Sequence, residues 1–83
     1  MSRAARPHVP LRPMWLCRAC GHPWPCGEAR LSLLVEYRGN RTALLIYLAV
    51  LQDEAAEQLA RLSPGKPPDG LTERFLSWAR ARG

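Results

Sequence analysis

Apolar residues recur at helical spacing through the middle of this 83-residue chain. Between residues 41 and 62 they return every three or four positions, and the second half of the segment carries acidic and polar residues on its other face. Asn40 suits the N-cap position before such a segment, and Ser63-Pro64-Gly65 ends it. We therefore predict one long amphipathic helix over 41–62. Its apolar stripe is formed by Leu44, Leu48, Leu51, Ala55, Leu59 and Leu62, widened by Ile46, Tyr47 and Val50.

Two shorter helices are predicted on either side of the long one. Over 28–38, three apolar residues fall on one face before a glycine that stops the helix. Over 69–81, a second apolar face follows a linker rich in proline and glycine, and it ends in basic residues that suit the helix dipole. The two faces are formed by Leu31, Leu34 and Val35, and by Leu71, Phe75, Trp78 and Ala79; Tyr37 and Tyr47 also hold core-like positions.

The expected fold class is all-α, because no apolar–polar alternation is long enough to predict a strand. Residues 1–27 carry five of the eight prolines, and no regular helix can run through them. We expect a proline-rich arm over 1–27 and a three-helix bundle over 28–83, together one domain. A chain this short has a marginal core, so such a domain usually needs a metal, disulfides or an oligomer interface.

Cysteine usage favours the metal among these. The chain has no apolar run long enough to span a membrane, and its N-terminus lacks the apolar core of a secretory signal. The expected location is therefore the cytoplasm, where thiols stay reduced. The three cysteines are also an odd number, which cannot close a complete disulfide framework.

The cysteines have the spacing of metal ligands. Cys17 and Cys20 form a Cys-x-x-Cys pair, which lets a tight turn present two thiolates to one tetrahedral ion. Gly21 suits that turn because glycine accepts positive φ, and Cys26 supplies a third thiolate. A structural zinc takes four ligands, so a histidine is expected to complete the set.

Two histidines compete for the fourth position. His22 lies inside the loop between Cys20 and Cys26, where flanking prolines limit how far it can turn inward. His8 lies nine residues before Cys17, and ligation there would tie down the proline-rich arm. We favour His8 and keep His22 as the alternative. Iron–sulfur ligands, a redox dithiol and free thiols are the other interpretations of the cysteines.

The chemistry around the cysteines leaves the partner open. Trp15 and Trp24 either cap the core or form an exposed platform for a partner. The formal net charge is +5, and Arg12, Arg18 and Arg30 lie in the basic N-terminal part. Because no catalytic constellation is visible, we predict a non-enzymatic zinc protein that binds another protein or a second copy of itself. Nucleic-acid binding through these arginines is the alternative.

The sequence also resembles a family of very short actinobacterial proteins. The resemblance rests on the string from His8 to Cys20, on Pro23-Trp24-Pro25-Cys26 and Ala29-Arg30, and on the later Glu36-Tyr37, Tyr47-Leu48 and Arg74-Phe75-Leu76-Ser77-Trp78. Many members carry the name flavin reductase, so the resemblance implies a flavin-linked role, as a reductase or as an accessory to a flavin enzyme. It also implies a histidine at position 8. The chain has no Gly-x-Gly-x-x-Gly fingerprint that would hold a dinucleotide.

Overall fold

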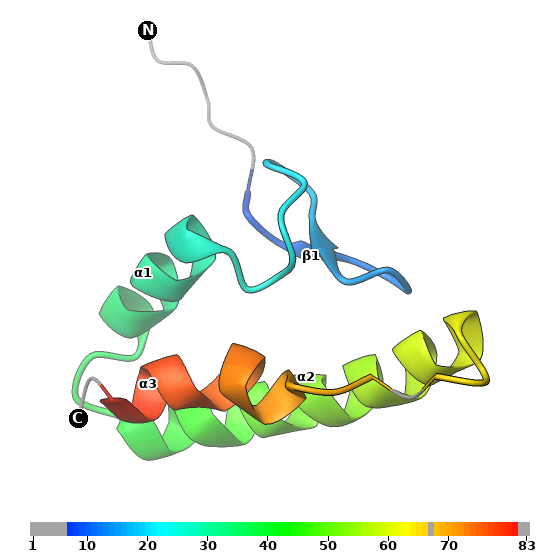
Figure 1. Ribbon diagram of the computed structural model, residues 1–83. Helices are drawn as coiled ribbons and strands as arrows, with labels where there is room; N and C mark the ends of the chain where they lie inside the picture. The colour runs from blue at the N-terminus through cyan, green and yellow to red at the C-terminus, as the bar shows by residue number, and fades with distance from the viewer. Residues whose placement is uncertain (1–6, 67, 82–83) are drawn as a thin grey trace, which may run out of the picture.

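The computed structural model describes residues 7–66 and 68–81. A two-stranded hairpin, β1 (Pro10–Leu11) and β2 (Leu16–Cys17), comes first. It is followed by α1 (Gly27–Glu36) and the long α2 (Arg41–Leu62). The chain then returns along α2 through a π-helical segment, η1 (Glu73–Ser77), which continues into α3 (Trp78–Ala81). Figure 1 shows α2 as the base of the molecule, with η1 and α3 beside it and the hairpin above.

The three expected helical segments are present, but the prediction of a purely all-α fold is wrong. β1 and β2 pair antiparallel, with Pro10 opposite Cys17 and Leu11 opposite Leu16. The Arg18 amide extends the pairing by donating to the Val9 carbonyl at 2.8 Å. Strands of two residues are too short to produce a recognisable alternation, so the sequence pattern did not indicate them.

The junction between α1 and α2 follows local signals. Gly39 has a φ of 81°, a left-handed conformation that glycine adopts without steric cost. The Asn40 side chain accepts a hydrogen bond from the Ala43 amide at 3.3 Å and caps α2, as predicted. The predicted bounds 41–62 match α2, whereas α1 begins one residue before the predicted 28 and ends two before the predicted 38.

The buried face of α1 differs from the predicted one. Ala29 and Leu33 are buried, while Leu31 and Val35 are 58% and 61% exposed. The reason is the position of Cys26, which is the N-cap of α1 and is itself buried. Residues three and seven positions after Cys26 lie on its side of the helix, so turning Cys26 inward turns Ala29 and Leu33 inward as well.

The core lies on one side of α2. Leu44, Leu48, Leu51 and Ala55 are buried there, whereas Leu62 is exposed at the end of the helix. Ile46 and Val50 point away from the core and are 61% and 60% exposed, so the prediction that they widen the buried stripe is wrong. Tyr47 was also expected in the core, but it is 39% exposed and stacks on Tyr37. The domain measures 43 × 32 × 15 Å along its principal axes, so it is a flat slab.

An aromatic cluster joins the N-terminal arm to the helices. The rings of Trp15, Trp24 and Phe75 lie with their centroids 5.7 to 6.1 Å apart, in tilted and edge-to-face arrangements. All three side chains are buried. The N-terminal arm and η1 therefore form one common core, and the arm does not lie on the surface of a separate helical bundle. None of the helices in the described part of the chain combines the length and apolar character that a membrane span requires.

Candidate metal centre

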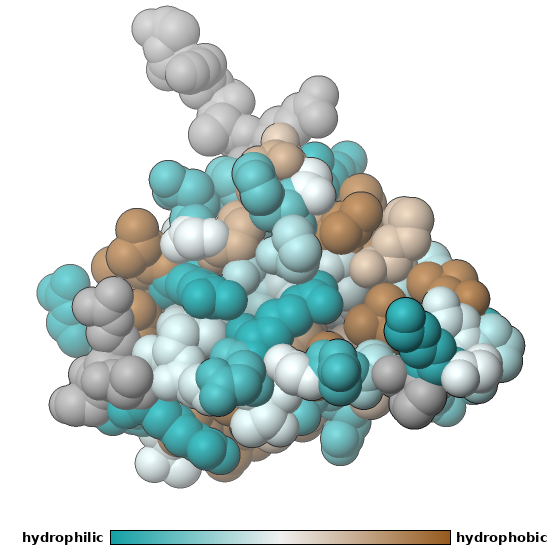
Figure 2. All heavy atoms as spheres, in the orientation of Figure 1, coloured by the Kyte–Doolittle hydropathy of each residue, from teal (hydrophilic) through white to brown (hydrophobic). Residues whose placement is uncertain are grey.

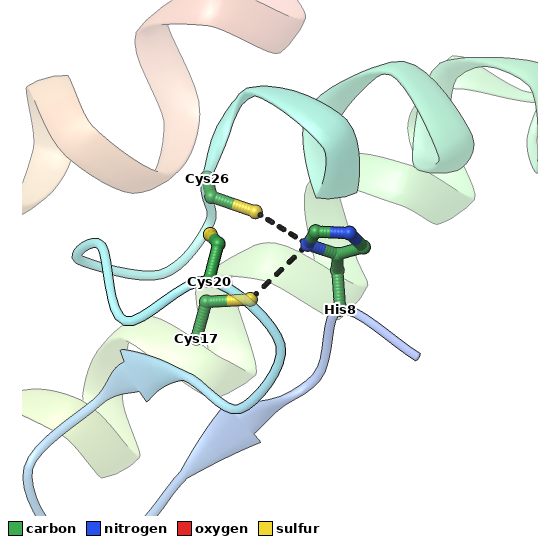
Figure 3. Close-up of side chains that lie close together, drawn as sticks. All are labelled: His8, Cys17, Cys20 and Cys26. Atoms are coloured by element: carbon green, nitrogen blue, oxygen red, sulfur yellow. Dashed lines mark hydrogen bonds between the residues drawn. The ribbon is translucent and has the colours of Figure 1, made fainter. Parts of the chain in front are cut away.

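Four side chains from the arm and the start of α1 converge on one point. His8, Cys17, Cys20 and Cys26 each offer one ligand atom, and these four atoms all lie within 4.8 Å of one another. The His8 Nδ1 atom lies 3.2 Å from the Cys17 sulfur and 3.3 Å from the Cys26 sulfur. Figure 3 shows the Cys17 and Cys26 thiols pointing toward the His8 ring, with Cys20 between them. The arrangement is that of a small closed ligand set.

The fold brings each of these residues to the site from a different element. His8 precedes β1, Cys17 ends β2, Cys20 lies in the turn that follows, and Cys26 caps α1. The turn after Cys17 closes through the Gly21 amide, which donates to the Cys17 carbonyl at 2.8 Å. Gly21 has a φ of 77°, so the expectation that this turn needs a glycine is confirmed.

His8, and not His22, lies with the thiols. The His22 side chain is exposed and is not part of the cluster. Its backbone explains why, because the His22 carbonyl accepts from the Cys17 amide at 2.7 Å and is fixed by the turn. The hairpin, in contrast, carries His8, two residues before β1, back beside Cys17. The pairing of β1 with β2 is therefore the feature that places His8 at the site.

Backbone amides prepare Cys17 for the ionised form. Burial alone would raise its pKa, but hydrogen bonds from the backbone of Cys20 and Ala19, together with those from the Cys20 and Cys26 side chains, outweigh it and lower the pKa of Cys17 to about 6. The Ala19 amide nitrogen lies 3.4 Å from the Cys17 sulfur. Burial raises the pKa of Cys26, and the neighbouring Cys17 adds to that effect. Metal binding requires thiolates, so a bound cation would offset this burial of negative charge.

The dimensions of the cluster fit a single tetrahedral ion. With Zn–S near 2.3 Å and Zn–N near 2.0 Å, a tetrahedral zinc places nitrogen and sulfur ligands about 3.5 Å apart. The two nitrogen–sulfur distances here, 3.2 and 3.3 Å, fall slightly below that value. Three thiolates and one imidazole are also a known structural zinc set. His8, Cys17, Cys20 and Cys26 could therefore hold one metal ion.

Hydrogen bonds to three backbone carbonyls hold the N-terminal arm in place. Trp24 Nε1 donates to the His8 carbonyl at 3.0 Å, which holds the histidine beside the thiols. Arg74, from η1, donates through Nε to the Trp24 carbonyl at 2.8 Å and through Nη2 to the Trp15 carbonyl at 2.7 Å. Burial lowers the pKa of Arg74, and nearby Arg30 adds to the effect. Sequence reasoning missed Arg74, because no local pattern marks an arginine whose partners are distant carbonyls.

The two tryptophans do not form an exposed platform. Trp15 and Trp24 are 0% and 3% exposed, so the interpretation that they cap the core agrees with the structure and the platform does not. The Trp15 indole nitrogen donates to Gln58 of α2 at 2.8 Å. Both rings are therefore packing residues, and neither offers a surface to a partner.

The arginines near the site are used unequally within the fold. Arg12 pairs with Glu54 and lies over the Trp15 ring, 4.8 Å from its centroid. Arg30 donates to the Pro25 carbonyl at 3.0 Å and lies over the ring of a tryptophan in α3. Arg18 is exposed on the hairpin side. Two of the three arginines considered for partner binding thus have structural roles.

A shallow cavity of about 630 Å³ opens beside the cluster of His8 and the cysteines. One wall is apolar and comes from α1 and α3, and three members of the cluster, His8, Cys20 and Cys26, line the cavity. Its residues include Leu31, Leu34 and Trp78, with Arg30 and His22 at the polar side. Cys17 and Cys26 are buried and Cys20 is exposed, so solvent reaches the cluster from the side of Cys20.

No protein-family model, curated protein or solved structure matches the chain. The resemblance to the short actinobacterial proteins stays a prediction. The functional interpretation accordingly depends on the residues of the site and on the surfaces around it.

Proposed function

We propose that the chain is a non-enzymatic zinc protein that binds another protein. In this proposal His8, Cys17, Cys20 and Cys26 hold one structural Zn²⁺, and the ion fastens the proline-rich arm to the helices. The observation that carries the proposal is the convergence of these four ligand atoms within 4.8 Å. An imidazole and three thiols from separate parts of the arm meet there, and two of the thiols are buried.

The ligand set favours zinc over the other metal interpretations. A single tetrahedral ion suits four ligand atoms this close together, whereas an iron–sulfur cluster holds its cysteines farther apart because the cluster lies between them. Four protein ligands also fill a tetrahedral zinc, so no position is left for the water that a hydrolytic site activates. The site is therefore proposed to be structural. Its thiols require a compartment in which cysteine stays reduced, as the cytoplasm does.

The ion would supply stability that the small core lacks. Structural zinc sites in small domains contribute about 10–16 kcal/mol of apparent binding free energy near neutral pH, and this becomes folding free energy. Here the metal would also fix the position of Trp24, because the His8 side chain would bind the metal while the His8 carbonyl accepts a hydrogen bond from the Trp24 indole. Loss of the metal is expected to loosen the arm and the aromatic cluster together.

Exposed apolar side chains support a protein partner. Ile46 and Val50 on α2 and Leu31 and Val35 on α1 are each between 58% and 61% exposed, although all four are aliphatic. Exposed aliphatic residues at helical spacing are typical of protein contact surfaces. The nucleic-acid alternative has less support, because Arg12 and Arg30 are held by Glu54 and a backbone carbonyl. A role as accessory to a flavin enzyme, which the resemblance implies, would be one form of protein binding.

The experiment compares the tagged full chain with a Cys17→Ser variant in native cells. We expect the unaltered chain to retain a protein partner after nuclease treatment and in high salt, and the variant to lose both its metal and that partner. A matched control is His22→Ala, which removes an exposed residue outside the cluster and is expected to keep the partner. Recovery of nucleic acid that salt releases would contradict the proposal, because phosphate contacts weaken steeply with salt. Flavin co-purifying with the chain alone would contradict it in favour of a reductase.

A further inference from the structure

The three cysteines of the cluster differ in their access to solvent. Cys17 and Cys26 are buried, with 1% and 6% of their surface exposed, whereas Cys20 is exposed. Cys20 also lines the cavity of about 630 Å³ that opens beside the cluster. On the face drawn in Figure 2, hydrophilic residues lie between the hydrophobic groups over α1 and over the hairpin. A small polar reagent in solution therefore meets Cys20 before it meets the other two cysteines.

A second thiol lies within reach of Cys20. The ligand atoms of the cluster all lie within 4.8 Å of one another, so both buried sulfurs are close to the Cys20 sulfur. Solvent-accessible cysteines with a neighbouring thiol are the ones that oxidants convert reversibly, first to a sulfenic acid and then to a disulfide. The cluster therefore contains both parts of a peroxide-sensitive pair, an exposed sulfur that reacts first and a buried sulfur that can displace the added oxygen.

The turn after β2 favours Cys17 as the buried member of the pair. The Cys20 thiol is within hydrogen-bonding distance of both buried sulfurs, but the Cys20 backbone also donates to the Cys17 sulfur. Only two residues separate Cys17 from Cys20, so a bond between them closes a short loop within one surface turn. Cys26, in contrast, follows the buried Trp24 and Pro25 and is the N-cap of α1. A bond to Cys26 would have to move that packed segment.

We propose that Cys20 is a redox modification site, at which a peroxide opens the cluster by forming a disulfide between Cys17 and Cys20. The Cys20 thiolate attacks one peroxide oxygen, so an S–O bond forms, the O–O bond breaks and hydroxide leaves. The Cys17 thiolate then attacks the Cys20 sulfur, so the S–S bond forms, the S–O bond breaks and a second hydroxide leaves. With two protons from solvent, two thiolates and one hydrogen peroxide give one disulfide and two water molecules. The two sulfurs lose two electrons in total, and the peroxide gains them.

The consequence of this oxidation rests on the proposed zinc site. The disulfide removes two of the four ligands, and the remaining His8 and Cys26 are too few for a structural zinc. The His8 carbonyl accepts from the Trp24 indole, whose ring packs against Trp15 in the aromatic cluster. Oxidation is therefore expected to release zinc and to loosen the N-terminal arm. Reduction by a dithiol followed by added zinc is expected to restore both.

Titration of the zinc-loaded full chain with hydrogen peroxide tests the proposal. A chromogenic chelator measures the released zinc, and tandem mass spectrometry of a non-reducing digest identifies the disulfide. We expect one zinc released per chain, a disulfide between Cys17 and Cys20, and Cys26 left as a free thiol. A disulfide that contains Cys26 would overturn the pairing, and zinc release without any disulfide would overturn the proposed reaction.

Histidine substitutions keep four metal ligands while they remove one thiol. Cys20→His leaves two cysteines and two histidines, which is a known structural zinc set, and it is expected to slow zinc release by peroxide at least about tenfold. Cys26→His is the matched control, because it has the same ligand set but keeps the Cys17 and Cys20 thiols, and it is expected to release zinc as the unaltered chain does. Zinc content and near-ultraviolet circular dichroism before oxidation show that each variant is loaded and folded. Equal release rates in the two variants would overturn the role of Cys20.

Alkylation of the metal-free unaltered chain tests the point of entry without any substitution. Cys20 is expected to react with iodoacetamide before the other two cysteines, because it is the exposed one. Faster alkylation of Cys17 or Cys26 would overturn Cys20 as the residue that meets the oxidant first.

Two results separate this inference from the proposed function. A chain that holds one zinc and keeps it, with its thiols reduced, in excess peroxide would overturn the redox site and leave the structural zinc standing. A chain that binds no zinc but forms the Cys17–Cys20 disulfide in peroxide would overturn the proposed zinc function and leave the modification site standing.

Discussion

Replacing Arg74 by methionine removes the hydrogen bonds that link η1 to the N-terminal arm. The guanidinium donates to the carbonyls of Trp15 and Trp24, and methionine keeps most of the side-chain length without either donor. A hydrogen bond from a charged donor contributes about 1.5–3 kcal/mol. The Trp15 carbonyl keeps a second donor, the Trp24 amide at 2.9 Å, so one of the two carbonyls remains satisfied. Burial of the Arg74 charge, reflected in its lowered pKa, offsets part of the gain.

These contributions give an expected loss of about 2–4 kcal/mol in the free energy of unfolding. Urea denaturation in saturating zinc, followed by near-ultraviolet circular dichroism of the tryptophans, measures it. Arg61→Met is the control, because Arg61 forms an ion pair with Glu57 at 3.0 Å in which both side chains are exposed. This substitution is expected to lower the free energy of unfolding by about 0.5 kcal/mol or less. A loss for Arg74→Met as small as that for Arg61→Met would refute this role of Arg74.

Two further predictions concern the layer behind the metal and the pair that joins the hairpin to α2. Trp24→Phe keeps a ring in the aromatic cluster but removes the donor to the His8 carbonyl, so it is expected to lower zinc affinity about tenfold in competition with a chelator. Trp15→Phe removes a donor to Gln58 instead and is expected not to lower zinc affinity in this way. Equal losses of affinity in the two variants would contradict the role of Trp24. The hydrogen bond from Arg12 holds the pKa of Glu54 below its usual range, so this pair stabilises the fold above the ordinary carboxyl pKa and is lost as acid protonates Glu54. Arg12→Met is expected to return the pKa of Glu54 toward its usual value in a carbon-detected NMR titration, and an unchanged value would contradict the pairing.

The parts of the fold that depend on neighbouring residues were predictable from the sequence. The extent of α2 and its Asn40 cap follow from apolar spacing and from one side chain that bonds three residues ahead. The closeness of His8 to the three cysteines was also predictable, because Cys-x-x-Cys spacing is local and His8 gives the arm a reason to be ordered. The residues of the cluster could therefore be identified from the sequence, whereas the binding of zinc stays a prediction.

The parts that depend on distant residues were not predictable. The inward face of α1 is set by Cys26, which must turn toward the thiols, and this overrides the apolar face that contains Leu31. The hairpin strands are too short to show a period. Arg74 bonds carbonyls 50 and 59 residues away along the chain, and no spacing rule marks such a contact. Each of these features is fixed by contacts between distant parts of the chain rather than by local preference.

The metal content of the purified full chain, measured by elemental mass spectrometry, shows whether His8 and the three cysteines hold zinc. We predict one zinc per chain, lost in His8→Ala and kept in His22→Ala, because His8 lies with the three thiols and the His22 side chain is exposed outside the cluster. Zinc that survives His8→Ala but is lost in His22→Ala would contradict the ligand set. A chain that folds without any bound metal, or that carries iron or flavin in place of zinc, would contradict the claim that a structural zinc holds the arm on the helices.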